Sequence, residues 1–240
     1  MAFGAEYGFS KRWGIIARLY IRIFGMIDLA SRVRARALIS ELKRIPMGTV
    51  VDFGCGTGAY AFFISRDPLR KVIAVDIDPQ RVADILETSE AISRNQLRVI
   101  CADELFFLRP GGAEYAGVIA SEVLVYCKNL GDLLSSIQKS ILPGGYFVAH
   151  IPVRASLQPF EHHLLDKTSL YGHLIRAGFH EVEIRPTMGA GARGLCALFD
   201  LIAPQKMLLA VLFPFLLIAT KFTSLYPSDG DSLLVIARKL

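Results

Sequence analysis

A glycine-rich turn constrains this chain more than any other feature. Residues 50–58 read Val-Val-Asp-Phe-Gly-Cys-Gly-Thr-Gly, so three glycines at alternate positions follow an apolar, β-branched segment. The next residues, Ala59 to Ile64, are typical of a helix start. Glycine has no Cβ, so a ligand can lie against bare backbone in such a strand–turn–helix unit, and the helix N-terminus presents free N–H groups to it. The sequence therefore predicts a ligand-binding turn after a buried strand.

Two classes of ligand use a turn of this kind. Residues 54–59 fit G-x-G-x-x-A, one form of the dinucleotide-binding fingerprint. Asp52, however, adds a carboxylate that we expect at the mouth of the turn, where it would repel a pyrophosphate and attract an ammonium group. Together with Gly58, it favours a ligand with an amino group over a nicotinamide dinucleotide.

The segment Asp52-Phe53-Gly54-Cys55-Gly56-Thr57-Gly58 resembles the first motif of the class I S-adenosylmethionine-dependent methyltransferases. In that family the turn holds the amino-acid end of the cofactor S-adenosylmethionine. The resemblance implies cofactor contacts from Asp52, Phe53, Gly54, Cys55, Gly56 and Gly58.

Residues after the next apolar segments extend the resemblance over residues 47–240. Asp76, 20 residues after Gly56, matches the acid that accepts hydrogen bonds from both ribose hydroxyls, and Ile77 follows it. The resemblance further implies cofactor contacts after the third and fourth strands, from Ala102, Asp103, Glu104, Ser121 and Glu122.

The alternation of apolar segments and helical patterns predicts an α/β fold with a mainly parallel sheet. Strands are expected near 49–53, 72–76, 97–101, 117–121, 145–151, 180–186 and 233–239, and helices near 58–66, 79–90, 129–140 and 166–177. The family resemblance implies a Rossmann-like seven-stranded sheet with helices on both faces and an antiparallel last strand. We divide the chain into a basic helical cap over 1–45 and a methyltransferase domain over 46–240, with an apolar insertion at about 200–228.

Basic residues are concentrated at the N-terminus. Residues 1–45 contain nine Lys or Arg and three acids, a net charge of +6, whereas the whole chain carries +5, which leaves −1 for residues 46–240. A nucleic-acid enzyme more often has a basic face around its active site, so we expect no nucleic-acid partner. The basic segment fits either contact with anionic lipid or a helical cap over the substrate cleft whose arginines face solvent.

A second unusual segment is 207–219, which is uncharged, contains Pro214 and lies between Lys206 and Lys221. A membrane-spanning helix needs about 20 apolar residues, so the segment is too short to cross. Two interpretations remain: a helix buried against the sheet, or a segment that enters one leaflet of a membrane. We favour the second, because the segment is apolar on all sides.

The remaining signals concern compartment and metal binding. The cysteines at 55, 101, 127 and 196 form no C-x-x-C pair, which indicates reduced thiols in a cytosolic protein. His162 and His163 are adjacent and lack other ligands at metal-site spacing, so no metal is expected. Arg18 and Arg22 interrupt the apolar stretch that a signal peptide needs. We expect a cytoplasmic protein on the inner face of the cytoplasmic membrane.

Methylation of a hydroxyl requires removal of its proton, so a general base is expected near the carboxyl ends of the strands. His150 is the first candidate, at the end of the fifth strand. Tyr126 and Glu122 follow the fourth strand, and His162 and His163 precede the helix near 166–177. An acceptor with an acidic hydroxyl or a carbanion-like carbon would need no strong base.

The sequence thus predicts an S-adenosylmethionine-dependent methyltransferase. A small lipophilic or lipid-linked acceptor, methylated on oxygen at an anionic membrane surface, is favoured by the apolar insertion and the basic segment. Two alternatives stay open: an NAD(P)-binding oxidoreductase, and a non-catalytic module that binds S-adenosylmethionine.

Overall fold

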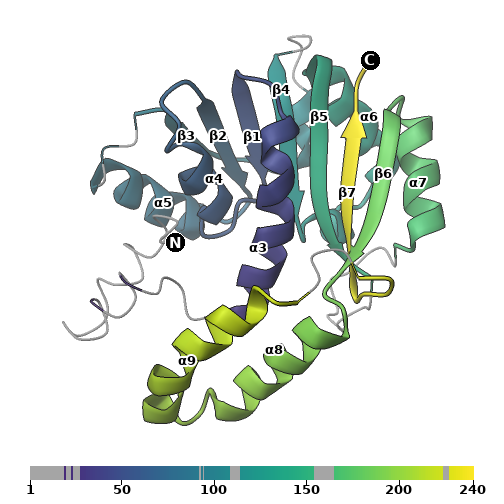
Figure 1. Cartoon of the computed structure of the whole chain (residues 1–240). Helices are drawn as coiled ribbons and strands as arrows, with labels where there is room; N and C mark the ends of the chain where they lie inside the picture. The colour runs from purple at the N-terminus through teal and green to yellow at the C-terminus, as the bar shows by residue number, and fades with distance from the viewer. Residues whose placement is uncertain are drawn as a thin grey trace.

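The computed structural model describes residues 28–91, 93, 95–108, 114–153, 165–223 and 227–240, with the isolated positions 19 and 23. Seven strands form one sheet in the order β3-β2-β1-β4-β5-β7-β6 (Figure 1). The strands are β1 (Thr49–Phe53), β2 (Lys71–Asp76), β3 (Leu97–Cys101), β4 (Tyr115–Ser121), β5 (Ile141–Pro152), β6 (His180–Thr187) and β7 (Ser232–Arg238). β7 is antiparallel to both of its neighbours and the other pairings are parallel, so the predicted fold class is confirmed.

Helices cover both faces of the sheet, as predicted. One face carries α3 (Leu29–Glu41), α4 (Ala59–Ile64) and α5 (Pro79–Ala91), and the other carries α6 (Leu130–Ser140) and α7 (Lys167–Arg176) (Figure 1). Short 3₁₀ helices follow α3, β3 and β4, namely η1 (Leu42–Arg44), η2 (Glu104–Leu108) and η3 (Leu124–Tyr126). Alternate strand residues enter opposite cores: Val50 packs in the cluster of Phe62, and Val51 in that of Leu134.

The insertion between β6 and β7 is a pair of helices, α8 (Ala190–Ile202) and α9 (Lys206–Thr220). It therefore begins earlier than the predicted residue 200, and α8 was not predicted. Pro152 of β5 pairs with Ser232 of β7, so the insertion leaves and re-enters the sheet at the carboxyl ends of the parallel strands. Figure 1 shows both helices projecting beyond that edge.

These two helices have a small core of their own. Phe213 and Leu216 of α9 pack with Ile202 of α8 and with Leu29 of α3, and all four side chains are buried. The less favoured interpretation, a helix buried against the sheet, is therefore wrong, because α9 packs on α8 and on the start of α3. No helix in the described ranges is long and apolar enough to cross a membrane.

Arginines of α3 and η1 make contacts within the protein. Arg36 donates from Nη1 to the carbonyl of Thr220 (2.6 Å) and from Nη2 to that of Lys221 (3.3 Å), which satisfies the C-terminus of α9. The Arg32 guanidinium lies 5.8 Å from the centre of the Phe213 ring. Arg44 pairs with Glu41 (2.7 Å) and Glu183 (2.7 Å). Arg36 stays exposed and Arg32 and Arg44 half-buried, so these contacts are compatible with a cap whose arginines face solvent. Contact of the segment with anionic lipid stays a prediction. Within the predicted cap, the described part is mainly α3, and the boundary at residue 45 stays a prediction.

Candidate active site

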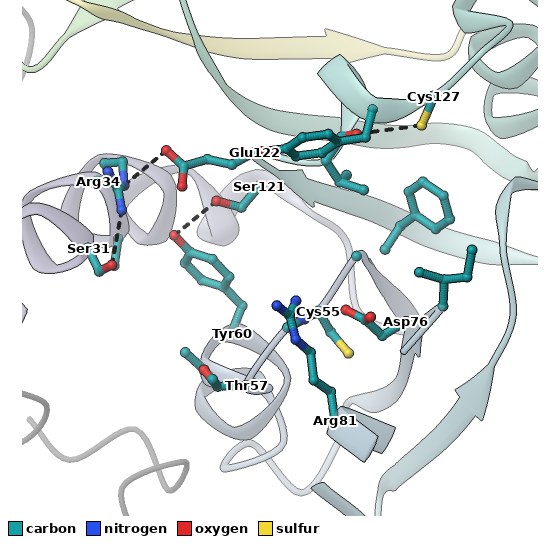
Figure 2. A pocket seen from close by; sticks show the side chains of 18 of the residues that line it. Ser31, Arg34, Cys55, Thr57, Tyr60, Asp76, Arg81, Ser121, Glu122 and Cys127 are labelled. Atoms are coloured by element: carbon teal, nitrogen blue, oxygen red, sulfur yellow. Dashed lines mark hydrogen bonds and ion pairs between the residues drawn. The ribbon is translucent and has the colours of Figure 1, made fainter. Parts of the chain in front are cut away.

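A pocket of about 510 Å³ lies at the carboxyl ends of β1, β2 and β4, bounded by α3 (Figure 2). Of the residues predicted to contact a cofactor, all except Asp52 and Gly58 line it: Phe53, Gly54, Cys55, Gly56, Asp76, Ile77, Ala102, Asp103, Glu104, Ser121 and Glu122. The parallel strands all end at this edge, which is why residues distant in sequence meet here. Their individual contacts with a cofactor stay predictions.

The backbone N–H groups of the glycine turn donate hydrogen bonds to nearby residues of the protein. The N–H groups of Gly54 and Cys55 both donate to the carbonyl of Val75 (2.8 and 3.0 Å), and that of Gly58 donates to Cys55 (2.8 Å). The N–H of Gly56 donates to Oδ2 of Asp76 (2.7 Å). A pyrophosphate would need such N–H groups free. The geometry therefore favours a ligand without phosphate in the turn.

Asp76 is held in one orientation at the floor of the pocket. Its Oδ2 accepts from Gly56, and its Oδ1 accepts from the N–H of Asp78 (3.0 Å), while only 5% of the residue is exposed. Each carboxylate oxygen keeps a further lone pair, so a vicinal diol can donate two hydrogen bonds to it. Arg81, which sequence reasoning missed, extends from α5 toward the turn in Figure 2 and also lines the pocket.

Asp52 and Gly58 do not line the pocket. Asp52 is 1% exposed, its Oδ2 accepts from the N–H of Ala61 (3.0 Å), and its Oδ1 has no hydrogen-bond partner among the described residues. Burial raises the pKa of this carboxyl to about 7. The expectation that Asp52 stands at the mouth of the turn is corrected by this burial. Gly58 has φ +75° and begins α4, where a Cβ would lie 3.1 Å from the Phe62 ring.

The wall opposite the turn comes from α3, which agrees with the alternative of a helical cap over the substrate cleft, although none of its residues was predicted as a site residue. Asp28, Ser31, Arg32, Arg34 and Ala35 line the pocket. The sequence offered no signal for this, because the direction of a charged side chain on a short helix depends on what the helix packs against. Tyr60 of α4 was not predicted as a site residue either. Its hydroxyl oxygen lies 3.4 Å from the hydroxyl oxygen of Ser121 (Figure 2).

Glu122 connects this wall to the sheet. Its Oε1 lies 3.1 Å from Nε of Arg34, and Arg34 donates from Nη2 to the Ser31 hydroxyl (3.0 Å). Its own backbone has φ +59°, a conformation that L residues rarely adopt. Burial raises the pKa of the Glu122 carboxyl, Arg34 opposes this shift and Asp28 adds to it. Figure 2 shows the carboxylate pointing toward α3, on the far side of the pocket from Asp76.

The structure places one of the predicted bases, Tyr126, in the pocket and another, His150, outside it. Tyr126 lines the pocket and is 46% exposed. His150 is fully buried beneath the wall, with Nε2 3.1 Å from the Thr187 hydroxyl, and is absent from the pocket lining. Burial lowers the pKa of His150 to about 3, and the charge of Arg34 adds to the shift. This placement contradicts the expectation that His150 faces the substrate.

The remaining predictions concern two histidines and metal binding. His162 and His163 lie outside the described residues. The described ranges hold no group of three or more His, Cys, Asp or Glu side chains that could bind a metal ion.

The family described as a methyltransferase domain matches residues 27–183. A ribosomal protein L11 methyltransferase of Bordetella parapertussis is 30% identical over 105 residues, which are 43% of this chain and 31% of the relative. A trans-aconitate 2-methyltransferase of Pseudomonas aeruginosa is 28% identical over 128 residues, 51% of this chain and 43% of the relative. The chain thus spans less than half the length of these curated relatives.

The fold has counterparts among solved structures. Phosphoethanolamine N-methyltransferase 2 of Haemonchus contortus, in complex with S-adenosyl-L-methionine, superposes with a TM-score of 0.63 at 19% identity. The superposition covers 85% of this chain and 52% of the other. At this identity the likeness concerns the fold alone.

Proposed function

The chain belongs to the class I S-adenosylmethionine-dependent methyltransferase family, and from that premise we propose that its pocket binds S-adenosylmethionine and methylates a small lipophilic or lipid-linked acceptor on oxygen, at a membrane surface. The cofactor supplies a methyl group that its sulfonium charge already activates, so the protein chiefly has to align the acceptor and remove a proton. The residues that would hold the cofactor are those of the turn, with Asp76.

The pocket fits this cofactor in two respects. Gly54, Gly56 and Gly58 have positive φ angles of +67°, +55° and +75°, and a Cβ on Gly56 would meet only Arg81 at 3.9 Å, so this glycine keeps one side of the turn open to a ligand. The fixed carboxylate of Asp76 suits the two ribose hydroxyls. The oxidoreductase alternative is disfavoured because the N–H groups of Gly54, Cys55, Gly56 and Gly58 already have partners.

The observation that carries the acceptor class is a row of exposed apolar side chains on α9. Met207, Val211, Phe215 and Ile218 of α9 follow one another at intervals of three or four residues and are 53–88% exposed. That spacing places them on one face of a helix, opposite the buried Phe213 and Leu216. We call this row the α9 stripe.

A lipid surface is the partner that suits the α9 stripe. The row is apolar throughout and projects beyond the sheet edge, whereas soluble proteins rarely expose a contiguous apolar surface without a function. An interfacial helix buries such a face at the boundary between headgroups and acyl chains. Lys221, which is exposed at the end of α9, can remain at headgroup level.

The α9 stripe and the pocket belong to the same end of the molecule. Arg32 of α3 lines the pocket and also lies over the Phe213 ring of α9. A protein bound through the α9 stripe would therefore hold its pocket near the membrane surface, where a lipophilic hydroxyl is concentrated. This proposal places the protein peripherally on the inner face of the cytoplasmic membrane.

A label-transfer experiment tests the proposed function. The protein is incubated with methyl-labelled S-adenosylmethionine and anionic vesicles made from a bacterial lipid extract, and the label is measured after extraction into organic solvent. We expect enzyme-dependent label in the organic phase, and none with Asp76→Asn, which weakens cofactor binding. Label found only in water-soluble products would contradict the lipophilic acceptor.

A further inference from the structure

We propose that Glu122 is the group that accepts the acceptor's proton, and that His150 is a positioning residue that holds this carboxylate and receives a hydrogen bond from it once it is protonated. The inference rests on the proposed function, because it concerns the proton that a hydroxyl loses on methylation. It also assigns Glu122 to the acceptor rather than to the cofactor.

The backbone of Glu122 is held in an unusual conformation that directs its side chain. With φ +59° it is strained, and such strain persists at functional sites where the surroundings enforce it. The N–H of Glu122 donates to the carbonyl of His150 (2.7 Å), which fixes the residue at the end of β4. Figure 2 shows that the carboxylate then reaches into the pocket beside Ser121 and Arg34.

Hydrogen-bond partners assign the tautomer of His150. The Thr187 hydroxyl has a single proton, which it donates to the carbonyl of Ser232 (3.2 Å), so its oxygen accepts from Nε2–H of His150 (3.1 Å). Nδ1 of His150 is then an unprotonated acceptor. It is buried, makes no hydrogen bond within the described chain, and lies 3.9 Å from Oε1 of Glu122.

Nδ1 of His150 and Oε1 of Glu122 are thus two hydrogen-bond acceptors that lie 3.9 Å apart at the wall of the pocket. An ionised Glu122 gives Nδ1 nothing to bind, whereas a protonated Glu122 can donate to it after a small movement. A buried acceptor without a donor is costly, and the protonated carboxyl removes that cost. The pair thus forms a site that favours one added proton.

The charged groups around Glu122 allow this proton to stay on the carboxyl. Burial and Asp28 raise the pKa of Glu122, whereas the Arg34 guanidinium lowers it. His150 cannot take the proton as a cation, because burial brings its pKa to about 3. Tyr60, on the same side of the pocket, stays a phenol, since burial raises its pKa to about 12.

The proposed step balances in atoms and charge. The hydroxyl oxygen of the acceptor bonds to the methyl carbon as the carbon–sulfur bond breaks, and the sulfur keeps that electron pair. The hydroxyl proton moves to the carboxylate of Glu122, so a sulfonium and a carboxylate become a thioether and a carboxylic acid. The carboxylic acid then loses its proton to water.

Nitrogen NMR of histidine tests the pair without an acceptor. In protein labelled with ¹⁵N-histidine and saturated with S-adenosylhomocysteine, His150 is assigned with the variant His150→Gln. We expect the neutral Nε2–H tautomer, and an inflection of the Nδ1 shift above the ordinary carboxyl range of about pH 4.3. The inflection should vanish in Glu122→Gln and persist in Glu90→Gln, a matched change at an exposed position of α5.

The same variants separate this inference from the proposed function. In the label-transfer assay Glu122→Gln should lower turnover roughly 10²–10⁴-fold, with calorimetric affinity for S-adenosylhomocysteine within a few-fold of the wild type. An Nδ1–H tautomer in the wild type overturns the inference even if the variant fails to fold. So does a variant that transfers methyl groups at the wild-type rate. If the wild type does not bind S-adenosylhomocysteine, the proposed function itself fails.

Discussion

Serine substitution along the α9 stripe should abolish membrane binding without unfolding the protein. Met207, Val211, Phe215 and Ile218 are 88%, 63%, 66% and 53% exposed, so their replacement removes little of the packing within the protein. Full burial of an apolar side chain of this size contributes roughly 1.5–3 kcal/mol. Scaled by the exposed fractions, the four side chains together contribute at least about 4 kcal/mol of lipid contact, which corresponds to about a thousandfold in partition coefficient.

The assay is flotation with vesicles at two salt concentrations. The wild type should float with anionic vesicles. The fourfold variant should stay in solution and fold with unchanged affinity for S-adenosylhomocysteine, although its melting temperature should fall because Ile218 and Val211 are partly packed within the protein. Salt should weaken wild-type binding only in part, because Arg36 and Arg44 have partners within the protein and apolar contacts are not screened.

A buried residue of the same helix provides the control. Phe213 is 0% exposed, so Phe213→Ser should lower the free energy of unfolding by about 3–5 kcal/mol, as truncation of a core phenylalanine does. Two results would refute the proposed lipid contact of the α9 stripe. In one, the fourfold variant floats with anionic vesicles like the wild type; in the other, the wild type does not float with vesicles of any composition.

Three further substitutions test the turn. Gly54→Ala should destabilise the protein in thermal melts, because φ is +67° and the new Cβ would lie 2.5 Å from Val123. Gly56→Val is strained too, because φ is +55°, but its Cβ would meet only Arg81 at 3.9 Å. We expect it to fold with a lower melting temperature and to lose calorimetric binding of S-adenosylhomocysteine at least about tenfold, since the side chain would fill the cofactor's path. The pKa of Asp52, about 7 against an ordinary 3.8, means that the folded state binds this proton more tightly. Stability in urea should therefore fall as pH rises from 4 to 7, and Asp52→Asn should remove this decline.

The strands were predictable because each is a short apolar, β-branched run bounded by turn residues. The glycine turn after β1 indicated that the cofactor binds at the carboxyl ends of the parallel strands. The helix α8 was not predictable from the sequence, because Gly191 and Gly194 weaken its helical pattern and its stability comes from packing on α9. The apolar sequence of α9 could not separate burial against the sheet from exposure. Its structure has both a face packed on α8 and a face in solvent.

The acceptor side of the site was harder to predict than the cofactor side. The cofactor residues follow strand ends, whose position a parallel sheet dictates. Arg34 instead depends on how α3 packs, and the partner of His150 is Thr187, 37 residues away in sequence. The sequence therefore predicts that His150, at a strand end, faces the substrate, whereas its neighbours in β6 and β7 bury it.

Isothermal calorimetry with S-adenosylhomocysteine tests the central claim most directly. We expect the wild type to bind S-adenosylhomocysteine and not NAD. Asp76→Ala should lose most of that affinity, because each charge-assisted hydrogen bond to a ribose hydroxyl contributes about 1.5–3 kcal/mol. Binding of NAD without binding of S-adenosylhomocysteine would contradict the account, and so would unchanged S-adenosylhomocysteine affinity in Asp76→Ala.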